Sequence, residues 1–131
     1  MSIFDAIGIA GTGVTVNRKW MDAVSDNLAN INTAVRTSDP AYEAKYVVAA
    51  EAADGKGTQV AGIVTGSAEG KLVYDPSNPL ADEQGYVKYP DIDMSTQMTS
   101  LIMAQRAYQA NLSVIDRSKE AYQAALQLGK A

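Results

Sequence analysis

Apolar residues repeat with a seven-residue period at both ends of the chain, in alternating steps of four and three. Near the N-terminus the repeat comprises Ile3, Ile7, Ala10, Val14, Asn17, Met21, Val24, Leu28 and Ile31. Near the C-terminus it comprises Met94, Met98, Leu101, Gln105, Tyr108, Leu112, Ile115, Lys119, Tyr122 and Leu126. This spacing is typical of the seam of a helix that packs lengthwise against another helix. The sequence therefore predicts helices over residues 3–32 and 94–128 that pair with each other.

Each predicted helix also carries a second apolar face beside the seam. On the first helix this face comprises Ala6, Ile9, Gly13, Val16, Trp20 and Ala23, and on the second Met103, Ala107, Ala110, Val114, Ala121 and Leu128. One partner helix cannot cover two faces, and a chain of 131 residues with this pattern predicts no third long helix. We therefore expect other subunits to cover the second faces.

The segment between the helices has the two-residue period of half-buried strands. One face of the run from Tyr42 to Glu51 is apolar, with Tyr42, Ala44, Tyr46, Val48 and Ala50, and the other carries Glu43, Lys45 and Glu51. β-branched residues are frequent from Thr58 to Thr65. The turn-forming residues 54–57 lie between these runs, which predicts a β-hairpin. Two further extended segments are predicted at 71–74 and 86–89.

These patterns together predict an α+β fold in which long N- and C-terminal helices form a coiled coil, with a small β-hairpin region between them. Residues 1–33 and 94–131 are expected to form one discontinuous helical domain, and residues 34–93 a β or extended insert. Asp93 is a suitable N-cap for the second helix. The first helix is expected to end in the Asn-rich segment 27–33, where asparagine tolerates the left-handed conformation of a C-terminal cap.

Composition narrows the classes of function. The net charge is −4 and the lysines and arginines are scattered, which argues against a nucleic-acid partner. The sequence contains neither cysteine nor histidine, which removes disulfides, the usual zinc sites and the commonest general base. The chain is also without an apolar run long enough to span a membrane and without the pattern of a cleavable signal peptide. We therefore expect synthesis in the cytoplasm, no cofactor, no small-molecule substrate and no enzymatic activity.

Five carboxylates invite comparison with a metal site. They are Asp75, Asp82, Glu83, Asp91 and Asp93. Their spacing does not follow the alternating ligand pattern of a calcium-binding loop, so turn formation and solvation are the favoured interpretation. A carboxylate-based hydrolase has no motif to support it.

Three ordered motifs carry a resemblance to a known family. The first is Asn27-Leu28-Ala29-Asn30-Ile31-Asn32-Thr33, and the second is Arg106-Ala107-Tyr108-Gln109-Ala110-Asn111. The third is the linker, with Leu72-Val73-Tyr74-Asp75-Pro76, then Asp82-Glu83-Gln84-Gly85-Tyr86-Val87 and Tyr89-Pro90. Together they resemble the axial proteins of the bacterial flagellum, the rod and hook family, and in the linker the proximal rod type. The sequence departs from that type at Glu43-Ala44, where two arginines are usual.

The resemblance implies a structural subunit without catalysis. It would be exported without a cleavable signal by the flagellar type III apparatus. It would then self-associate with other proximal and distal rod proteins, and with the rod-base adaptor and MS ring, in the periplasmic part of the basal body. A different class stays open from the residues alone, namely a soluble cytoplasmic coiled-coil adaptor that forms a small oligomer.

Nine residues are candidates for assembly contacts. They are Trp20, Asn27, Asn30, Asn32, Thr33, Arg106, Tyr108, Asn111 and Leu112. For the asparagines and Thr33 the alternative is a helix cap and turn within the chain. The alternative for Arg106 is a position on a solvent-exposed helix face. The alternative for Trp20 is an ordinary role in the core of its own subunit. Tryptophan, tyrosine and arginine are enriched among interface anchors, which favours contacts at these positions.

Overall fold

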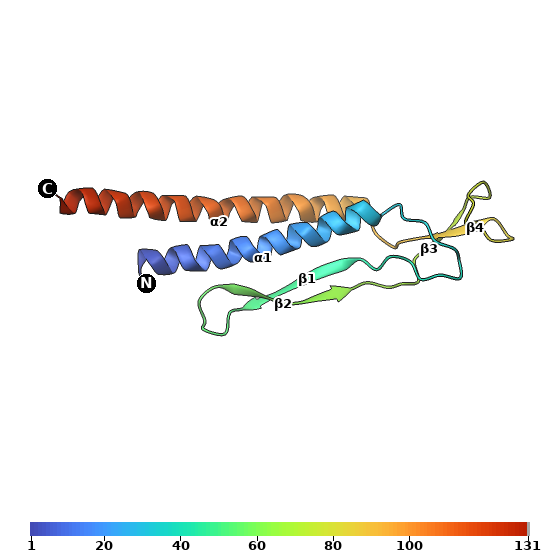
Figure 1. Cartoon of the computed structure of the whole chain (residues 1–131), viewed down its shortest axis with the longest axis horizontal. Helices are drawn as coiled ribbons and strands as arrows, with labels where there is room; N and C mark the ends of the chain where they lie inside the picture. Colours follow the sequence, from blue (N-terminus) through green and yellow to red (C-terminus); the bar gives the residue numbers. More distant parts are fainter. Residues whose placement is uncertain (131) are drawn as a thin grey trace.

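The computed structural model describes residues 1–130 and gives an elongated α+β molecule (Figure 1). Its elements in chain order are α1 (Ile3–Asn30), β1 (Lys45–Glu51), β2 (Thr58–Thr65), β3 (Lys71–Tyr74), β4 (Tyr86–Tyr89) and α2 (Met94–Gly129). The two helices run antiparallel, with both termini at the end away from β3 and β4. The predicted fold class is confirmed. Ala131, which the predicted helical domain included, lies outside the described residues.

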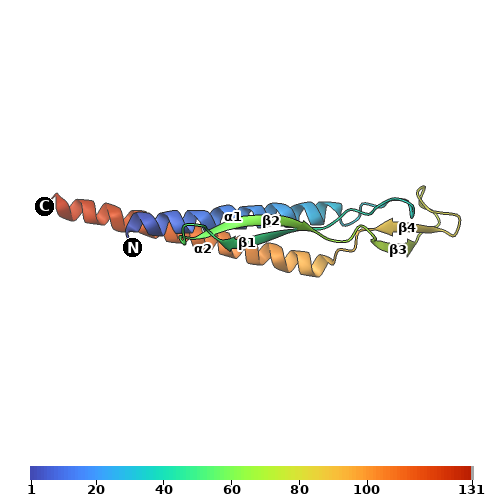
Figure 2. The same ribbon diagram turned by 90° about the horizontal axis from the view of Figure 1, so that it is seen from below.

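The long part of the molecule has three layers: the β1–β2 hairpin, α1 in the middle, and α2 (Figure 1). Seen from below, the hairpin overlies the pair of helices (Figure 2). α1 contacts α2 on one side and both strands of the hairpin on the other. The buried apolar residues are few and small: Ala10, Val16, Ala23, Val24, Ala41, Ala44, Val87, Ile92 and Ala104. The expectation that other subunits must cover the second face of α1 was therefore wrong, because the chain itself covers part of it with the hairpin, near Val16, and part with α2, at Gly13.

The row of residues that α2 presents to α1 differs from the predicted seam. Gln97 and Ala104 are buried and Leu101 is half-buried, whereas Met98 is 45% exposed and Leu112 is 37% exposed. The polar interruptions of the predicted seam, Gln105 and Lys119, are also exposed. Small Ala104 permits a close approach of the helices, and Gln97 has a hydrogen-bond partner on α1. Because Gln97 and Ala104 face α1, the larger side chains of Met98 and Leu112 lie at the side of α2. Both rows have steps of four and three, so spacing alone could not distinguish them.

The ends of the helices are fixed by local hydrogen bonds. At the start of α1, the amide of Asp5 donates to Ser2 Oγ at 3.1 Å and the amide of Ser2 donates to Asp5 Oδ2 at 3.0 Å, a reciprocal cap. At its end, Ile31 is right-handed with φ −58°, and no non-glycine residue among those described has a positive φ. The predicted left-handed asparagine cap was therefore wrong. Instead, the Asn30 side-chain Nδ2 donates to the Asp26 carbonyl at 2.9 Å, and the backbone amide of Ile31 donates to the Leu28 carbonyl, one of the free carbonyls of the last turn, at 3.4 Å.

Asp93 caps α2 as predicted, since its carboxylate accepts from the Thr96 amide and from the Thr96 hydroxyl, each at 2.7 Å. The Thr96 hydroxyl and amide hold the pKa of Asp93 below its ordinary value.

We expect this cap to make the free energy of unfolding depend on pH in the acid range. Because the folded chain binds the Asp93 proton more weakly than the unfolded chain, the stabilisation is present above about pH 4 and is lost as the pH falls through the lowered pKa. Urea unfolding at pH 7 and pH 3 checks this expectation. The matched variant is Asp93→Asn, which keeps a good N-cap without a titrating group and should lose less stability than wild type between the two pH values. An equal loss in wild type and in Asp93→Asn would show that groups other than Asp93 cause the acid sensitivity.

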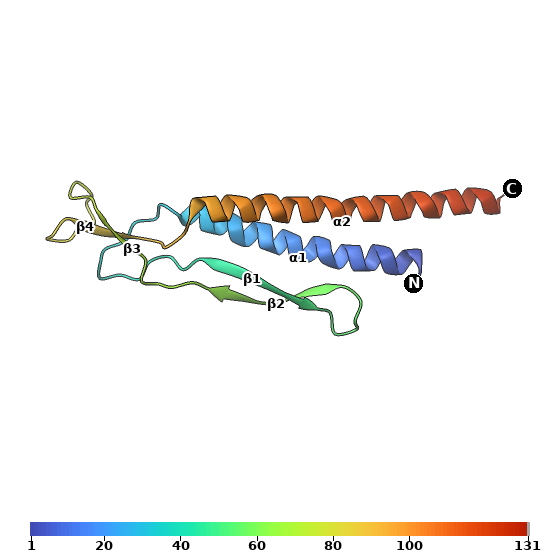
Figure 3. The ribbon, with the colours of Figure 1, turned by 180° about the vertical axis from the view of Figure 1, so that it is seen from behind.

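The central segment contains two antiparallel hairpins. β1 pairs with β2, with Tyr46 opposite Val64 and a bulge at Val48/Ala49, and β3 pairs with β4 at the far tip (Figure 3). These predicted strands are confirmed, except that β1 begins at Lys45 and not at Tyr42. Of the preceding residues, Tyr42 approaches α1 through its hydroxyl, which donates to Asn27, whereas Ala41 and Ala44 are buried beside Gly70 and Gly66. The tip is anchored by Val87 of β4, which has no exposed surface.

Candidate assembly surfaces and the Asn27 junction

Asn27 joins three segments of the chain at one buried point. Its Oδ1 accepts from the Lys45 amide at 2.7 Å and from the Tyr42 hydroxyl at 3.3 Å. Its Nδ2 donates to the Lys45 carbonyl at 2.9 Å and to Gln97 Oε1 at 3.0 Å. Asn27 is 0% exposed and Gln97 is 4% exposed. Both ends of the amide are therefore used, linking α1 to the start of β1 and to the first turn of α2 (the Asn27 junction).

Charged and phenolic groups surround this junction. The Lys45 ammonium lies 3.0 Å from Asp26 Oδ2, and its hydrogen bond and charge interaction with Asp26 raise the pKa of Lys45. Partial burial raises the pKa of Tyr42. Both groups thus keep their protons at neutral pH, so Tyr42 remains a donor to Asn27. The surface ion pair is exposed and contributes little by itself.

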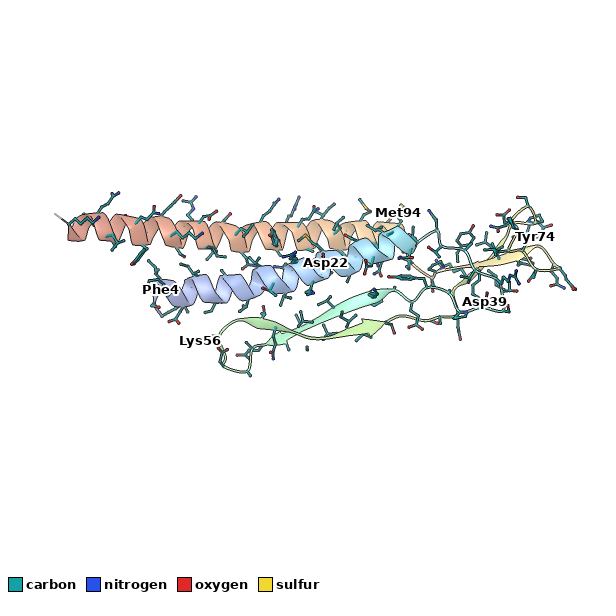
Figure 4. The ribbon with its side chains drawn as sticks, viewed as in Figure 1. Phe4, Asp22, Asp39, Lys56, Tyr74 and Met94 are labelled. Carbon is teal, nitrogen blue, oxygen red and sulfur yellow. The ribbon has the colours of Figure 1, made fainter. Side chains whose placement is uncertain are left out.

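A second set of contacts attaches the hairpin near its turn. The Thr12 hydroxyl accepts from the Thr58 amide at 3.1 Å and donates to the Ile9 carbonyl at 2.6 Å. Lys56 lies 3.3 Å from Asp5, whose pKa is lowered first by the Ser2 amide and then by Lys56. The hairpin is thus attached to α1 near both of its ends, and Figure 4 shows Lys56 at the turn, close to the beginning of α1.

The remaining residues of the N-terminal motif make local contacts. The Thr33 amide donates to the Asn30 carbonyl at 3.0 Å and its hydroxyl to Asn30 Oδ1 at 3.3 Å. Asn32 is exposed and lines a groove of about 460 Å³ with Lys71 and Tyr89, beside the start of α2. These positions agree with a cap and turn inside the subunit, and only Asn32 and Thr33 are free at the surface for a neighbour.

The candidates on α2 fall on different faces. Tyr108 and Asn111 are half-buried on the side of α1, whereas Arg106 and Leu112 are exposed. Asn111 donates to the Ala107 carbonyl at 3.0 Å. Its side chain also fills the space above Gly13, where an added Cβ would lie 2.7 Å from Nδ2. This close approach explains a glycine in the second apolar face of α1.

Trp20 lies between α1 and the hairpin. It is half-buried and lines a groove of about 370 Å³ together with Val16, Ala49, Thr58 and Asn111. Trp20 and Asn111 are therefore brought to one place, although they belong to different helices. A role of Trp20 in contacts between subunits stays a prediction.

Large apolar side chains remain exposed on α2 after the chain has folded. One flank carries Met94, Met98, Ile102 and Leu112, and the other carries Met103 and Val114. In the first flank Met94, Met98 and Ile102 follow at steps of four, and Leu112 lies on the same side ten residues later. Met103 and Val114 are eleven residues, about three helical turns, apart, so the members of each flank share one side of α2, and each set is called a stripe below. α2 also continues past the start of α1, because Phe4 contacts Tyr122 with ring centroids 5.4 Å apart and seven further residues of α2 follow Tyr122. Such stripes mark surfaces for protein partners.

Two further apolar surfaces were not predicted from the sequence, although both lie on strands whose two-residue period is visible in it. On the outer face of the β1–β2 hairpin, Tyr46, Val48 and Val64 are exposed. On β3–β4, Leu72 is 62% exposed and Tyr74 is 64% exposed, with the Tyr74 ring edge-on to Tyr86. Figure 4 shows Tyr74 at the tip, far from the helices.

Over residues 1–130 no group of three metal-binding side chains is found, and neither helix has a stretch long and apolar enough to cross a bilayer. The surfaces just described are suited to other proteins.

Known proteins resemble the chain over its whole length. A family model described as flagellar basal body rod FlgEFG protein C-terminal matches residues 83–128. The "Flagellar basal-body rod protein FlgC" of Escherichia coli O6:H1 is 37% identical, with 99% of this chain and 100% of the relative covered. The protein of the same name from Salmonella typhimurium is also 37% identical over the same shares. The one from Borreliella burgdorferi is 31% identical, with 98% of each chain covered. The chain therefore belongs to the FlgC family of flagellar basal-body rod proteins.

Proposed function

We propose that the chain is a structural subunit of the proximal rod of the flagellar basal body, where it assembles with other rod proteins into the shaft that transmits motor torque. The observation that supports this most directly is the pair of uncovered apolar stripes on α2. A helix that is apolar on both sides of its partner suits the interior of a larger assembly, because each stripe can be buried by a further helix.

The shape of the subunit supports an open-ended assembly. The two stripes lie on different sides of α2, so a neighbour that covers one stripe leaves the other available. Contacts between unlike surfaces that do not close into a ring produce filaments. Self-association of this kind, together with contacts to proximal and distal rod proteins, is the proposed mode of assembly.

The proposal extends to location and route. The partners at the base would be the rod-base adaptor and the MS ring, and the chain would reach the periplasmic rod through the flagellar type III apparatus without a cleavable signal peptide. The activity proposed is mechanical, with no catalytic step. The thin core and the few buried apolar residues favour a chain that depends on its neighbours for much of its buried area.

The direct test is mass spectrometry of purified hook–basal bodies and of the cytosolic fraction from the source cells. Enrichment in the basal bodies is the expected result. Recovery only in the cytosol, from cells with intact rods, would instead support the cytoplasmic adaptor, which should then purify as a discrete small oligomer at micromolar concentration.

The variant Leu112→Asp tests the stripe itself. Leu112 is 37% exposed in the subunit, so the change should leave folding nearly intact, within about 0.5 kcal/mol for a surface position. In an assembled rod the carboxylate would be buried against apolar side chains, which costs several kcal/mol without a partner. We therefore expect complete loss of swimming in soft agar, with normal amounts of the protein.

Ser113→Asp is the matched control, because it adds the same charge to the exposed polar row of α2 that also carries Thr99 and Arg117. Swimming should persist in that variant. Normal swimming of Leu112→Asp would contradict the assembly role of the stripe.

A further inference from the structure

The Asn27 amide is bonded to β1 in the way that a neighbouring strand would be. It accepts from the Lys45 amide at 2.7 Å and donates to the Lys45 carbonyl at 2.9 Å, so both backbone groups of one residue are paired by one side chain. An adjacent antiparallel strand makes the same pair of bonds to a residue opposite it. The side chain of α1 thus takes the place of a strand at the first residue of β1.

We propose that Asn27 is the positioning residue that docks the β1–β2 hairpin onto the helix pair and fixes its register along α1, so that the hairpin is held or released as one unit. The hairpin needs such an attachment, because a two-stranded sheet is marginally stable by itself in water. Its outer face gives no help within the subunit, since Tyr46 and Val64 are exposed.

The chemistry of the position selects asparagine. Two acceptors, the Lys45 carbonyl and Gln97 Oε1, face Nδ2, and two donors, the Lys45 amide and the Tyr42 hydroxyl, face Oδ1. A carboxylate satisfies the donors but turns a negative charge toward the two acceptors. A leucine satisfies neither pair, and glutamine carries its amide one methylene further from α1.

The far end of the hairpin makes the register specific. Thr12, which accepts from the Thr58 amide, precedes Asn27 by 15 residues, or about 22 Å along the helix. Sliding the hairpin by one helical turn, about 5.4 Å, would break the bonds at both ends together. Release would uncover the groove that contains Trp20 and Val16. The junction therefore controls which faces of α1 a neighbouring protein can meet.

The test is amide hydrogen exchange of the purified full-length chain, read residue by residue, in wild type, Asn27→Asp and Asn30→Asp at pH 7.5 and pH 4.5. The groups around position 27 that carry charge or titrate are Lys45, Asp26 and Tyr42, and the control Asn30→Asp adds the same carboxyl one turn later with only local partners. Protection factors remove the intrinsic effect of pH on exchange.

For Asn27→Asp at pH 7.5, we expect protection of β1 and β2 amides to fall at least tenfold more than protection of amides in the middle of α2, the local release of one cooperative unit. Burial beside two acceptors should raise the pKa of the introduced carboxyl above that of a free aspartate. At pH 4.5 the hairpin should therefore regain part of its protection, because a protonated carboxyl donates as well as accepts and so reproduces half of the amide. Asn30→Asp should show neither effect. Equal losses in hairpin and helices, or an unchanged hairpin, would overturn the proposal.

Two further measurements test the proposal even if the buried charge of Asn27→Asp prevents folding. Asn27→Ser removes the paired bonds without adding charge and should show the same selective loss in the hairpin at both pH values. The chain contains no cysteine, so Asp5→Cys/Lys56→Cys can report docking in intact cells through a short bis-maleimide cross-linker. Adding Asn27→Ser should lower the intramolecular cross-link at least fivefold, and an unchanged yield would contradict release of the hairpin.

Discussion

The replacement Asn27→Ala should lower the free energy of unfolding by about 3 kcal/mol, the larger part of it from groups left without partners. Alanine leaves the buried Lys45 amide and carbonyl and Gln97 Oε1 unpaired, and each such group costs about 1–3 kcal/mol, partly offset where water enters. Urea unfolding of the purified chain at 25 °C, followed by circular dichroism, measures the loss.

Asn30→Ala provides the comparison, because its side chain makes only local bonds near the surface. We expect a loss below about 1 kcal/mol there, which is the usual range for one partly exposed hydrogen bond. If the two alanine variants unfold at the same urea concentration, the Asn27 junction does not stabilise the fold in the way that its geometry indicates.

The second large effect is expected for Gly70→Ala, at about 3 kcal/mol or more. Gly70 has φ +65°, and a Cβ at this position would collide with the Tyr89 carbonyl and lie 2.7 Å from Ala41 Cβ. A positive φ costs an alanine about 1 kcal/mol by itself. The collision adds to that cost because a backbone carbonyl of β4 cannot move without disturbing the β3–β4 pairing.

Gly55→Ala separates the two contributions. Gly55 has nearly the same φ, +68°, but the nearest atom to an added Cβ is Glu51 Oε1 at 3.8 Å. Only the backbone term of about 1 kcal/mol should remain. Thermal unfolding of both variants under identical conditions gives the difference, and similar melting temperatures would show that the tip adapts to the extra methyl group.

Elements with a clear period could be predicted from the sequence. The heptad steps gave both helices to within two residues at each end, and the alternation and turn residues gave β2, β3 and β4 at their observed bounds. The face of α2 that meets α1 could not be predicted, because apolar rows one position apart have the same spacing. The choice depends on how small Ala104 is and on what Gln97 finds across the interface.

The Asn27 junction illustrates the same limit for the candidate site. Asn27 stood out in a motif, but its partners Lys45 and Gln97 are 18 and 70 residues away in the sequence, and neither carries a local signal for the contact. Gln97 could have been noticed only as a polar residue in the row next to the predicted seam. The reciprocal cap formed by Ser2 and Asp5, by contrast, follows a short pattern that is readable in the sequence.

The packing of α1 against α2 has a consequence for the order of folding. Its contacts join residues far apart in the chain, as in the pair Phe4 and Tyr122, which are 118 residues apart (122 − 4). Closing so long a loop costs entropy before any contact repays it, and a glycine-containing helix without a partner is marginal in water. A chain that emerges N-terminus first, as from a ribosome, therefore lacks α2 as a partner for α1 until its last quarter appears, whereas the hairpin that covers the other side of α1 emerges earlier. We therefore expect the helix pair, and with it most of the packing between distant parts of the chain, to form late, once residues 94–129 of α2 have emerged.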